Sequence, residues 1–314
     1  MKLQQLRYAV EVFRRNLNVS EAADALFTSQ PGVSKQIRLL EDELGAQIFI
    51  RSGKRIVAVT KAGQAILETA ELILRHVQNI KKISAKFSDT QSGMLTIAAT
   101  HSVLRFRLPE TVAAFAKAFP DVQITLKQGS PDEIAEMVLT GEVDLAIGQD
   151  VPETTAELSR LSCGAWNYIL LMPRTHPLAQ KNVFTLNDLA DLPLLTYSFA
   201  FDDGAVATRA FNRARLAWHT VFLSNDSEVL KQYIRLGLGV GLLDSAAYQQ
   251  DADSDLVAIN VQYLFEPCEY KILLRNDTLI CSYTYDFIQH VEPNLNRERV
   301  NKLMYSPAVE DFSI

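Results

Sequence analysis

Cysteine is scarce in this 314-residue chain, and the spacing of the few cysteines excludes two kinds of structure. Cys163, Cys268 and Cys281 are odd in number and far apart, and they form no C-x-x-C pair. No histidine lies at metal-ligand spacing from them. Because disulfide frameworks and structural zinc sites need paired or closely spaced ligands, we expect neither, and we predict no metal site and no cofactor. The three cysteines are predicted to be buried thiols.

Long apolar runs and catalytic motifs are missing as well. No stretch reaches the roughly 18 uninterrupted apolar residues of a membrane span, and residues 1–8 lack the apolar run of a signal peptide. We therefore expect a cytoplasmic protein with no membrane partner. The histidines have no Ser or Cys in a nucleophile elbow beside them, and the glycines at 237–241 lack the spacing of a nucleotide-binding loop. We predict no catalytic residue and no enzyme activity.

Charge is unevenly distributed along the chain. The net charge is −6, yet residues 1–90 contain 14 Lys and Arg against 9 Asp and Glu, a net charge of +5. The remaining residues contain 17 against 28, a net charge of −11. A basic N-terminal module on an acidic body indicates that only the module contacts a polyanion, although a solvated basic surface with no partner has the same composition.

The segment 18–44 is predicted to form two short helices joined by a tight turn. Asn18 and Glu21 have the spacing of a capping box, and Ser29 is placed to cap the second helix. An apolar stripe runs along one face of that helix, at Val33, Ile37, Leu40 and Leu44. An ordinary helical hairpin is the alternative. The caps, the small-residue turn and the basic N-terminal half of the second helix favour a helix-turn-helix that reads DNA.

Two segments of this module are predicted to contact DNA. The polar face of the second helix suits the major groove, where short amide, hydroxyl and basic groups meet base edges. A β-hairpin is predicted to follow at 47–59, and a hairpin in this position is a wing whose basic residues meet phosphate or the minor groove. The expected DNA-binding residues are Ser20, Thr28, Ser29, Gln30, Pro31, Ser34, Lys35, Gln36, Arg38, Arg51, Ser52, Lys54 and Arg55.

A long helix is predicted from its cap, Thr60, to about Phe87. One set of positions along it is spaced alternately four and three residues apart: Ala62, Ile66, Thr69, Ile73, His76, Ile80, Ile83 and Phe87. This spacing is a heptad seam, whose partner is either a second copy of the chain or the body of the same chain. We favour a dimer, because a polar stretch separates the seam from the later core.

Strands and helices alternate beyond the polar boundary at 88–93. Two such series, at 94–148 and 169–243, predict two α/β subdomains with a cleft between them. Ligands of such sheets bind beyond the carboxyl ends of the strands, and small polar residues follow predicted strands at 100–102, 129–131 and 224–227. Taken singly, each is more commonly only a helix cap. Clustered at one cleft, they indicate a site for a small polar or anionic molecule.

With these motifs, the chain resembles a LysR-type transcriptional regulator over essentially its whole length. The most specific match is Thr-Ser-Gln-Pro-Gly-Val-Ser-Lys-Gln-Ile at 28–37. Further matches lie at 22–23, 40–45, 48–51, 60–63, 176–178 and 237–241. Within the family, the chain most resembles the CysB/Cbl subgroup, which controls sulfur assimilation. That likeness rests on 1–8, 16–20, 51–54, 128–131 and 283–289.

The resemblance implies an α/β protein of three parts. They are a winged helix-turn-helix DNA-binding domain at 1–60, a linker and dimerisation helix at 61–88 and an effector-binding domain at 89–314. The last is expected to be of the periplasmic-binding-protein-like (type 2) fold. Its subdomain I comprises about 93–163 and 268–292, and its subdomain II about 164–267. The partners implied are double-stranded promoter DNA, further copies of the chain in a dimer or tetramer, RNA polymerase and a small-molecule effector.

The expected effector-binding residues are Thr100, His101, Ser102, Gly129, Ser130, Gln149, Trp166, Tyr197, Asp202 and Asp226. The chain departs from the subgroup here, because Val103 replaces an amide, and Gln149 and Asp202 replace threonines. An Asp repels a dianion, so O-acetylserine, whose amine would meet Asp202, is favoured over a sulfur oxyanion such as sulfate. N-acetylserine is a further candidate, and Asp202 turned to solvent is the alternative. The competing functions are regulation of sulfonate use or oxidative stress by the same kind of protein, and solute binding.

Overall fold

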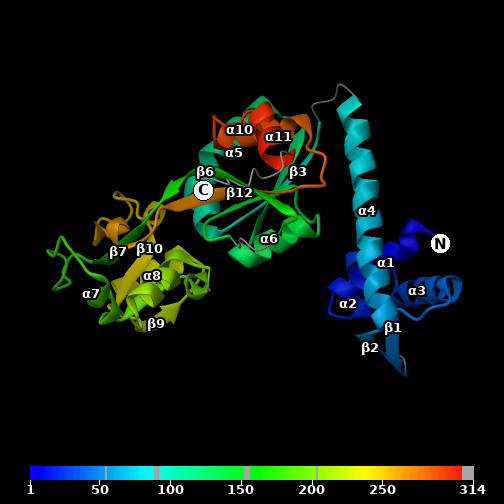
Figure 1. Cartoon of the computed structure of the whole chain (residues 1–314), viewed down its shortest axis with the longest axis horizontal. Coiled ribbons are helices and arrows are strands. Elements are labelled where there is room, and N and C mark those ends of the chain that lie inside the picture. Colours follow the sequence, from blue (N-terminus) through cyan, green and yellow to red (C-terminus); the bar gives the residue numbers. More distant parts are fainter. Residues whose placement is uncertain (54, 88–91, 152–155, 203, 306–314) are drawn as a thin grey trace, which may run out of the picture. The chain divides into compact units, whose positions relative to one another are not determined.

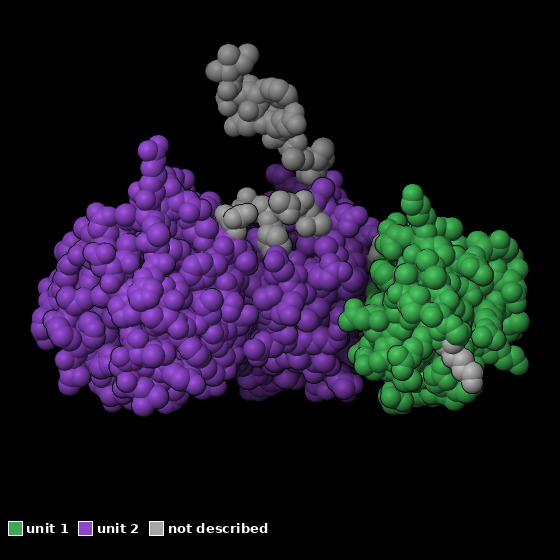
Figure 2. Space-filling model, turned by 90° about the horizontal axis from the view of Figure 1, so that it is seen from below, with its two compact units in different colours: residues 1–88 green, residues 89–314 purple. Residues whose placement is uncertain are grey.

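The structure is a computed structural model that describes residues 1–53, 55–87, 92–151, 156–202 and 204–305. Side chains at 75, 78, 79 and 81–87 are not described. The chain divides into two compact units, residues 1–88 and residues 89–314, which Figure 2 shows in different colours. None of the described helices is long and apolar enough to cross a membrane.

The first unit contains a helix-turn-helix, a hairpin and a long helix (Figure 1). Its elements are α1 (Leu3–Arg14), α2 (Val19–Ala25), α3 (Gln30–Leu44), β1 (Phe49–Ser52), β2 (Arg55–Val59) and α4 (Lys61–Phe87). The predicted caps are confirmed. Asn18 Oδ1 accepts the N–H groups of Ser20 at 3.1 Å and Glu21 at 3.3 Å. Ser29 Oγ accepts the Gly32 N–H at 3.3 Å, so both helices begin where the sequence predicts.

The core of this unit lies between α1, α2 and α3. Val33, Ile37 and Leu40 of the predicted stripe are fully buried in it. Leu44 was expected to continue the stripe, but 40% of its surface is exposed. The buried stripe therefore ends at Leu40, one turn before the end of the helix. The helix itself stops at Gly45, whose φ of 64° is left-handed.

Part of the predicted heptad seam of α4 packs against the core of the first unit itself. Leu67 and Ala70 are buried in the core of the first unit, and Ile66 and Ile73 are partly buried against the same core. Packing on its own body therefore accounts for Ile66 and Ile73. Four other seam residues are exposed, namely Ala62, Thr69, His76 and Ile80. The side chains of the last two, Ile83 and Phe87, lie outside the description.

The second unit contains two five-stranded sheets. The first has the order β4-β3-β5-β12-β6, in which β3, β4 and β5 are parallel and β12 is antiparallel to both β5 and β6. Its strands are β3 (Gly93–Ala99), β4 (Val122–Gln128), β5 (Leu145–Gly148), β6 (Leu158–Trp166) and β12 (Cys268–Arg275). The helices of this subdomain are η1 (Val103–Arg107, a π-helical turn), α5 (Leu108–Ala118), α6 (Pro131–Leu139), α10 (Ser282–Val291) and α11 (Arg297–Tyr305).

The second sheet has the order β11-β7-β10-β8-β9, with β10, β8 and β9 parallel. Its strands are β7 (Tyr168–Pro173), β8 (Leu194–Thr196), β9 (Thr220–Leu223), β10 (Val240–Asp244) and β11 (Leu256–Asn260). The helices of this subdomain are α7 (Leu186–Ala190), η2 (Ser198–Phe201), α8 (Val206–Ala214), α9 (Ser227–Arg235), η3 (Ser245–Ala247) and η4 (Gln262–Leu264).

The chain passes between the two sheets along β6 and β12, which lie side by side in Figure 1 and pair from Cys268 with Trp166 to Arg275 with Leu158. Trp166, the last residue of β6, and Tyr168, the first residue of β7, also contact each other, with their ring centroids 4.8 Å apart. The predicted fold class is confirmed: an N-terminal winged helix-turn-helix, a long helix and two α/β subdomains.

Candidate functional site

The helix-turn-helix presents its predicted DNA-binding residues at the surface. None of those that the structure describes is buried. The exposed ones are Ser20, Ser29, Gln30, Pro31, Lys35, Arg38, Ser52 and Arg55. The half-buried ones are Thr28, Ser34, Gln36 and Arg51. Lys54, at the tip of the predicted wing, lies outside the described residues.

At the start of α3, three of these residues contact other side chains or the backbone of the module. Gln30 Nε2 donates to Ser34 Oγ at 3.3 Å on the exposed face of α3, so the two polar groups are held together at the start of the helix. Ser29 caps that helix. A hydroxyl that accepts a backbone N–H retains its own proton to donate, so capping leaves Ser29 able to contact phosphate.

The sequence predicts Phe27 only as part of the turn between the two helices, and the structure shows two unusual features of this residue. The side chain is 97% exposed, and its φ of 51° lies in the left-handed region that bulky residues seldom adopt. Phe27 immediately precedes the first predicted DNA-binding residues of the turn. Its aromatic character was visible in the sequence, but its exposure and its backbone conformation were not.

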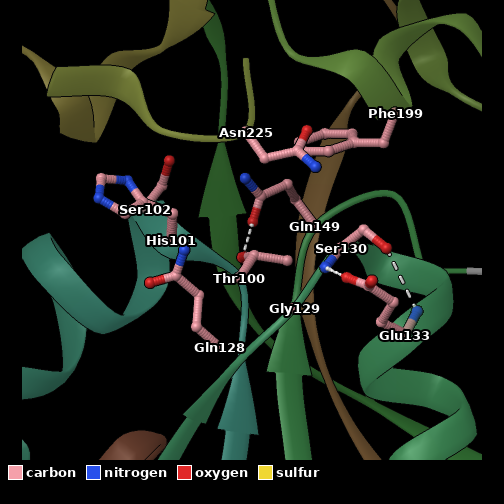
Figure 3. A pocket seen from close by; sticks show the side chains of 10 residues that line it. All are labelled: Thr100, His101, Ser102, Gln128, Gly129, Ser130, Glu133, Gln149, Phe199 and Asn225. Atoms are coloured by element: carbon pink, nitrogen blue, oxygen red, sulfur yellow. Dashed lines mark hydrogen bonds between the residues drawn. The ribbon is translucent and has the colours of Figure 1, made fainter. Parts of the chain in front are cut away.

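The pocket of the second unit lies at the carboxyl ends of three parallel strands. Thr100 follows β3, Gly129 follows β4 and Gln149 follows β5. The cavity has a volume of about 150 Å³, and Figure 3 shows the ten residues that line it: Thr100, His101, Ser102, Gln128, Gly129, Ser130, Glu133, Gln149, Phe199 and Asn225. Phe199 and Asn225 belong to the second subdomain and approach from the side opposite the strand ends (Figure 3). We call this cavity the strand-end pocket.

Two buried contacts position the floor of the strand-end pocket. Thr100 Oγ1 donates to Gln149 Oε1 at 2.6 Å, which leaves the Gln149 amide nitrogen as a donor. Ser102 Oγ lies 3.3 Å from the hydroxyl of Tyr197, a fully buried residue of the other subdomain. The Tyr197 hydroxyl also accepts the Asp244 N–H at 3.2 Å. This hydrogen bond fixes the position of the hydroxyl that contacts Ser102.

His101 joins the two subdomains at the edge of this pocket. Its Nδ1 lies 3.2 Å from Ser227 Oγ, and its Nε2 lies 3.2 Å from Asp226 Oδ1. Burial lowers the pKa of His101 more than Asp226 raises it, so the imidazole is neutral near pH 7. Asp226 Oδ1 also accepts the Glu228 N–H at 2.8 Å, which makes Asp226 the cap of α9.

Glu133 gives the strand-end pocket its charge. Its Oε2 accepts the Ser130 N–H at 2.7 Å, while Ser130 Oγ accepts the Glu133 N–H at 3.3 Å, so the pair forms a capping box at the start of α6 (Figure 3). Among the described residues that line the pocket, there is no Lys or Arg, and Glu133 is the single carboxylate. A bare anion would meet only dipoles and one negative charge here.

The ten predicted effector-binding residues do not form one set. Six line the strand-end pocket, but Tyr197 lies behind its wall and Asp226 packs against His101 at its edge. Trp166 and Asp202 line a different cavity. The expectation that Asp202 meets an amine beside Thr100 is therefore corrected. The helical turn η2 directs Phe199 into the strand-end pocket, and Asp202, three residues later, points elsewhere.

The pocket also contains residues that the prediction omitted: Gln128, Glu133, Phe199 and Asn225. Asn225 lies in a segment predicted as a strand end, 224–227, and Gln128 directly precedes another, 129–131. Glu133 had a detectable signal, because Ser130 and Glu133 have the spacing of a capping box. Phe199 had none, since its place depends on the packing of the second subdomain.

Comparison with known proteins identifies the class. Residues 3–64 match the bacterial regulatory helix-turn-helix proteins of the lysR family, and residues 88–295 match the LysR substrate binding domain. The chain belongs to the LysR family of DNA-binding transcriptional regulators, which is not a class of enzymes.

Its relatives place it near the CysB and Cbl regulators. It is 42% identical over 302 residues to the HTH-type transcriptional regulator CysB of Haemophilus influenzae, covering 96% of this chain and 93% of the relative. It is 37% identical over 304 residues to the HTH-type transcriptional regulator SsuR of Burkholderia cenocepacia, covering 97% and 99%. The cofactor-binding domain of the Cbl transcriptional regulator is similar in structure, with a TM-score of 0.64 and 32% identity, covering 70% of this chain and 96% of that one.

Proposed function

We propose that this regulator switches promoters of sulfur assimilation and cysteine biosynthesis genes when a small metabolite of that pathway binds in the strand-end pocket. The observation that carries the proposal is the convergence of Thr100, Ser102 and Gln149 with Phe199 and Asn225. Polar groups at the carboxyl ends of parallel strands are the usual ligand site of open α/β sheets. The likeness to CysB supports the pathway. The likeness to SsuR supports regulation of sulfonate use as the second candidate.

The DNA-binding module supports the other half of the proposal. Exposed Gln30, Lys35 and Arg38 on α3 would enter the major groove of double-stranded promoter DNA, and Ser52 and Arg55 of the wing would contact its backbone. A spaced operator needs more than one copy of the module, and the exposed seam residues of α4 are available to a second copy in a dimer or tetramer. We infer RNA polymerase as a further partner, and the cytoplasm, where bacterial promoter DNA lies, as the compartment in which the regulator acts.

The charge of the strand-end pocket favours a zwitterion as effector. Residues 101 and 102 form a helical turn that continues into η1, and the first N–H groups of this segment have no partner within the helix. The Gln149 amide nitrogen is a further donor, so a carboxylate fits there. A protonated amine fits against Glu133. O-acetylserine has both groups. N-acetylserine lacks the charged amine, and sulfate or another sulfur oxyanion brings more negative charge beside Glu133.

Binding would be coupled to closure of the two subdomains. Thr100 and Glu133 lie in the first subdomain, and Phe199 and Asn225 lie in the second, so a ligand that contacts all four stabilises the closed arrangement. His101 already bridges to Ser227 and Asp226 of the second subdomain. The effector would add to this existing connection and so alter how the protein presents its DNA-binding modules.

Calorimetric titration with O-acetylserine, N-acetylserine, sulfate and thiosulfate tests the effector. We expect Glu133→Gln to weaken O-acetylserine binding about tenfold, because a charge-assisted hydrogen bond contributes about 1.5 kcal/mol, and to strengthen sulfate binding. Glu136→Gln, one turn later on the exposed face of α6, should change neither. Sulfate binding that is tight and equal before and after Glu133→Gln would contradict the zwitterion.

Footprinting on genomic fragments, with and without each compound, tests the regulatory function. Protection of fragments upstream of cysteine biosynthesis genes, changed by O-acetylserine, is the expected result. Protection confined to sulfonate-use genes would favour the second candidate. Protection of neither set would overturn the proposed pathway.

A further inference from the structure

The second unit contains a larger cavity, with a volume of about 560 Å³, that shares no described lining residue with the strand-end pocket. Its walls come from both subdomains and from β6 and β12, which connect them. Asp150 and Asp132 belong to the first subdomain, Asp202 and Arg209 to the second, and Trp166 and Glu269 to the connecting strands. We call it the hinge cavity. Sites for small molecules measure roughly 300–1,000 Å³, so the volume suits a metabolite of amino-acid size or larger.

Negative charge predominates in the hinge cavity. Among the described residues that line it, four have carboxylates, Asp132, Asp150, Asp202 and Glu269, and two are cations, Arg209 and Lys271. Arg209 is already paired outside this set, because its Nη2 lies 3.0 Å and its Nε 3.2 Å from Glu266 Oε2. The net charge of the lining therefore attracts a cation.

Asp150 shows where that cation would bind. One carboxylate oxygen, Oδ1, accepts the N–H of Val206, the first residue of α8, at 3.3 Å. The other, Oδ2, is buried and accepts no hydrogen bond from the described part of the chain. A buried carboxylate oxygen without a donor costs free energy, so a native protein normally supplies one from a side chain, a water or a ligand. Burial raises the pKa of Asp150 to about 6, because its effect exceeds the lowering by the Val206 N–H and by Arg209.

We propose that the hinge cavity is a second ligand site, which binds the protonated amine of a small metabolite with Asp150 as its counter-ion. Trp166 provides an aromatic surface for the remainder of the ligand. Asp150 contacts α8 of the opposite subdomain, so a ligand bound to it acts on the same subdomain contact as the effector of the strand-end pocket. The site is separate from that pocket and does not depend on which compound the pocket takes.

Aminopentanol is a suitable probe, because it has a protonated amine and no carboxylate, and pentanediol is its neutral analogue of equal length. The chain has two tryptophans, Trp166 and Trp218. In a Trp218→Phe variant of the full-length protein, Trp166 is the single tryptophan and reports on the hinge cavity. We expect aminopentanol to change Trp166 fluorescence in a saturable way and pentanediol to bind at least tenfold more weakly. Absence of a saturable change with aminopentanol, or equal binding of both compounds, would overturn the proposal.

Asp150→Asn tests the counter-ion, since it removes the charge and leaves an oxygen for the Val206 N–H. It should weaken aminopentanol binding at least tenfold, whereas Asp251→Asn, an exposed acid elsewhere in the unit, should not. Glu133→Gln should weaken O-acetylserine binding and leave aminopentanol binding unchanged. Undiminished aminopentanol binding to Asp150→Asn would overturn the second site and leave the proposed function intact. Loss of the O-acetylserine response alone would overturn the proposed effector and leave the second site intact.

The pH dependence of binding provides an independent readout. Because Asp150 has a pKa of about 6, it is mostly protonated at pH 5, and aminopentanol binding should weaken about tenfold between pH 7.5 and pH 5. The titratable groups of the described residues that interact electrostatically with Asp150 include Arg209, Asp202, Asp244, Tyr168 and Cys268. The pKa values of Tyr168 and Cys268 are raised, so neither group ionises in this range. Binding that is equal at both pH values would contradict Asp150 as the counter-ion.

Discussion

Glu41 of the recognition helix α3 and Arg51 of the wing form an ion pair, with 2.9 Å between Oε2 and Nη2. Glu41 is only 9% exposed, and its Oε1 accepts the N–H groups of both Ile48 and Phe49 at 3.0 Å. One carboxylate therefore fixes the first strand of the wing to the helix that is proposed to read DNA. Arg51 was predicted only as a DNA contact, and the structure gives it this second, structural partner.

Glu41→Ala should destabilise the first unit by about 3 kcal/mol, because it leaves two buried N–H groups without an acceptor and a partly buried guanidinium without its partner. Asp42→Ala, at an exposed neighbouring position, is the matched control and should change the free energy of unfolding by less than about 0.5 kcal/mol. Chemical denaturation of the full-length protein measures both. Equal effects of the two substitutions would show that the Glu41 contacts contribute little.

Lys35→Ala and Arg38→Ala should each weaken promoter binding and reduce the slope of its salt dependence by about one, as expected when a protein loses one phosphate contact. Arg15→Ala is the control, because Arg15 is an exposed cation of the same module, already paired with Glu11 at 3.0 Å. Fluorescence anisotropy on a footprinted promoter over a range of salt concentrations gives both quantities. Unchanged affinity for the Lys35 and Arg38 variants at moderate salt would argue against α3 as the reading helix.

Phe27→Gly should stabilise the first unit by about 0.5–1 kcal/mol, since glycine adopts a φ of 51° without the steric cost that a bulky residue has there. Almost no apolar burial is lost, because the ring is 97% exposed. Phe27→Ala keeps the steric cost and should not stabilise. Thermal unfolding of both variants decides the point, and a stabilising alanine would mean that relief of backbone strain is not the cause.

The features that the sequence predicted best are those determined by a few neighbouring residues. The caps Asn18 and Ser29 depend on groups within two or three positions, and both are found in the structure. The strand β6 (Leu158–Trp166) was not predicted, because it is defined by pairing with β12, more than a hundred residues later. Its alternation of buried and exposed residues is irregular, so no periodic signal marks it.

The candidate site was predictable only in part, for the same reason. Strand ends at Thr100, Gly129 and Gln149 follow from the alternation of strands and helices, and the parallel order of β3, β4 and β5 brings them together. The division of Phe199 and Asp202 between two cavities follows from the helical turn η2 and from contacts across the subdomains. No local pattern encodes those contacts.

Asp150→Asn should stabilise the second unit at neutral pH. The folded-state pKa of Asp150 is raised to about 6, so the folded protein binds this proton more tightly than the unfolded chain does. The contribution of Asp150 to the free energy of unfolding is therefore full below about pH 4, decreases as the pH rises and is lost above about pH 6. An asparagine is neutral at every pH and avoids this loss, which amounts to at most about 3 kcal/mol for a shift of about two pKa units.

The measurement is the melting temperature of the second unit within the full-length protein, for wild type, Asp150→Asn and Asp202→Asn, at pH 4 and pH 7.5. Asp150→Asn should match the wild type at pH 4 and exceed it at pH 7.5. Asp202 is exposed, so its substitution should give a much smaller difference at either pH. A difference for Asp150→Asn that is the same at both pH values would mean that the asparagine changes packing and not the cost of a buried charge. A saturating amine that raises the wild-type melting temperature at pH 7.5, but not that of Asp150→Asn, would connect this cost to the ligand proposed for the hinge cavity.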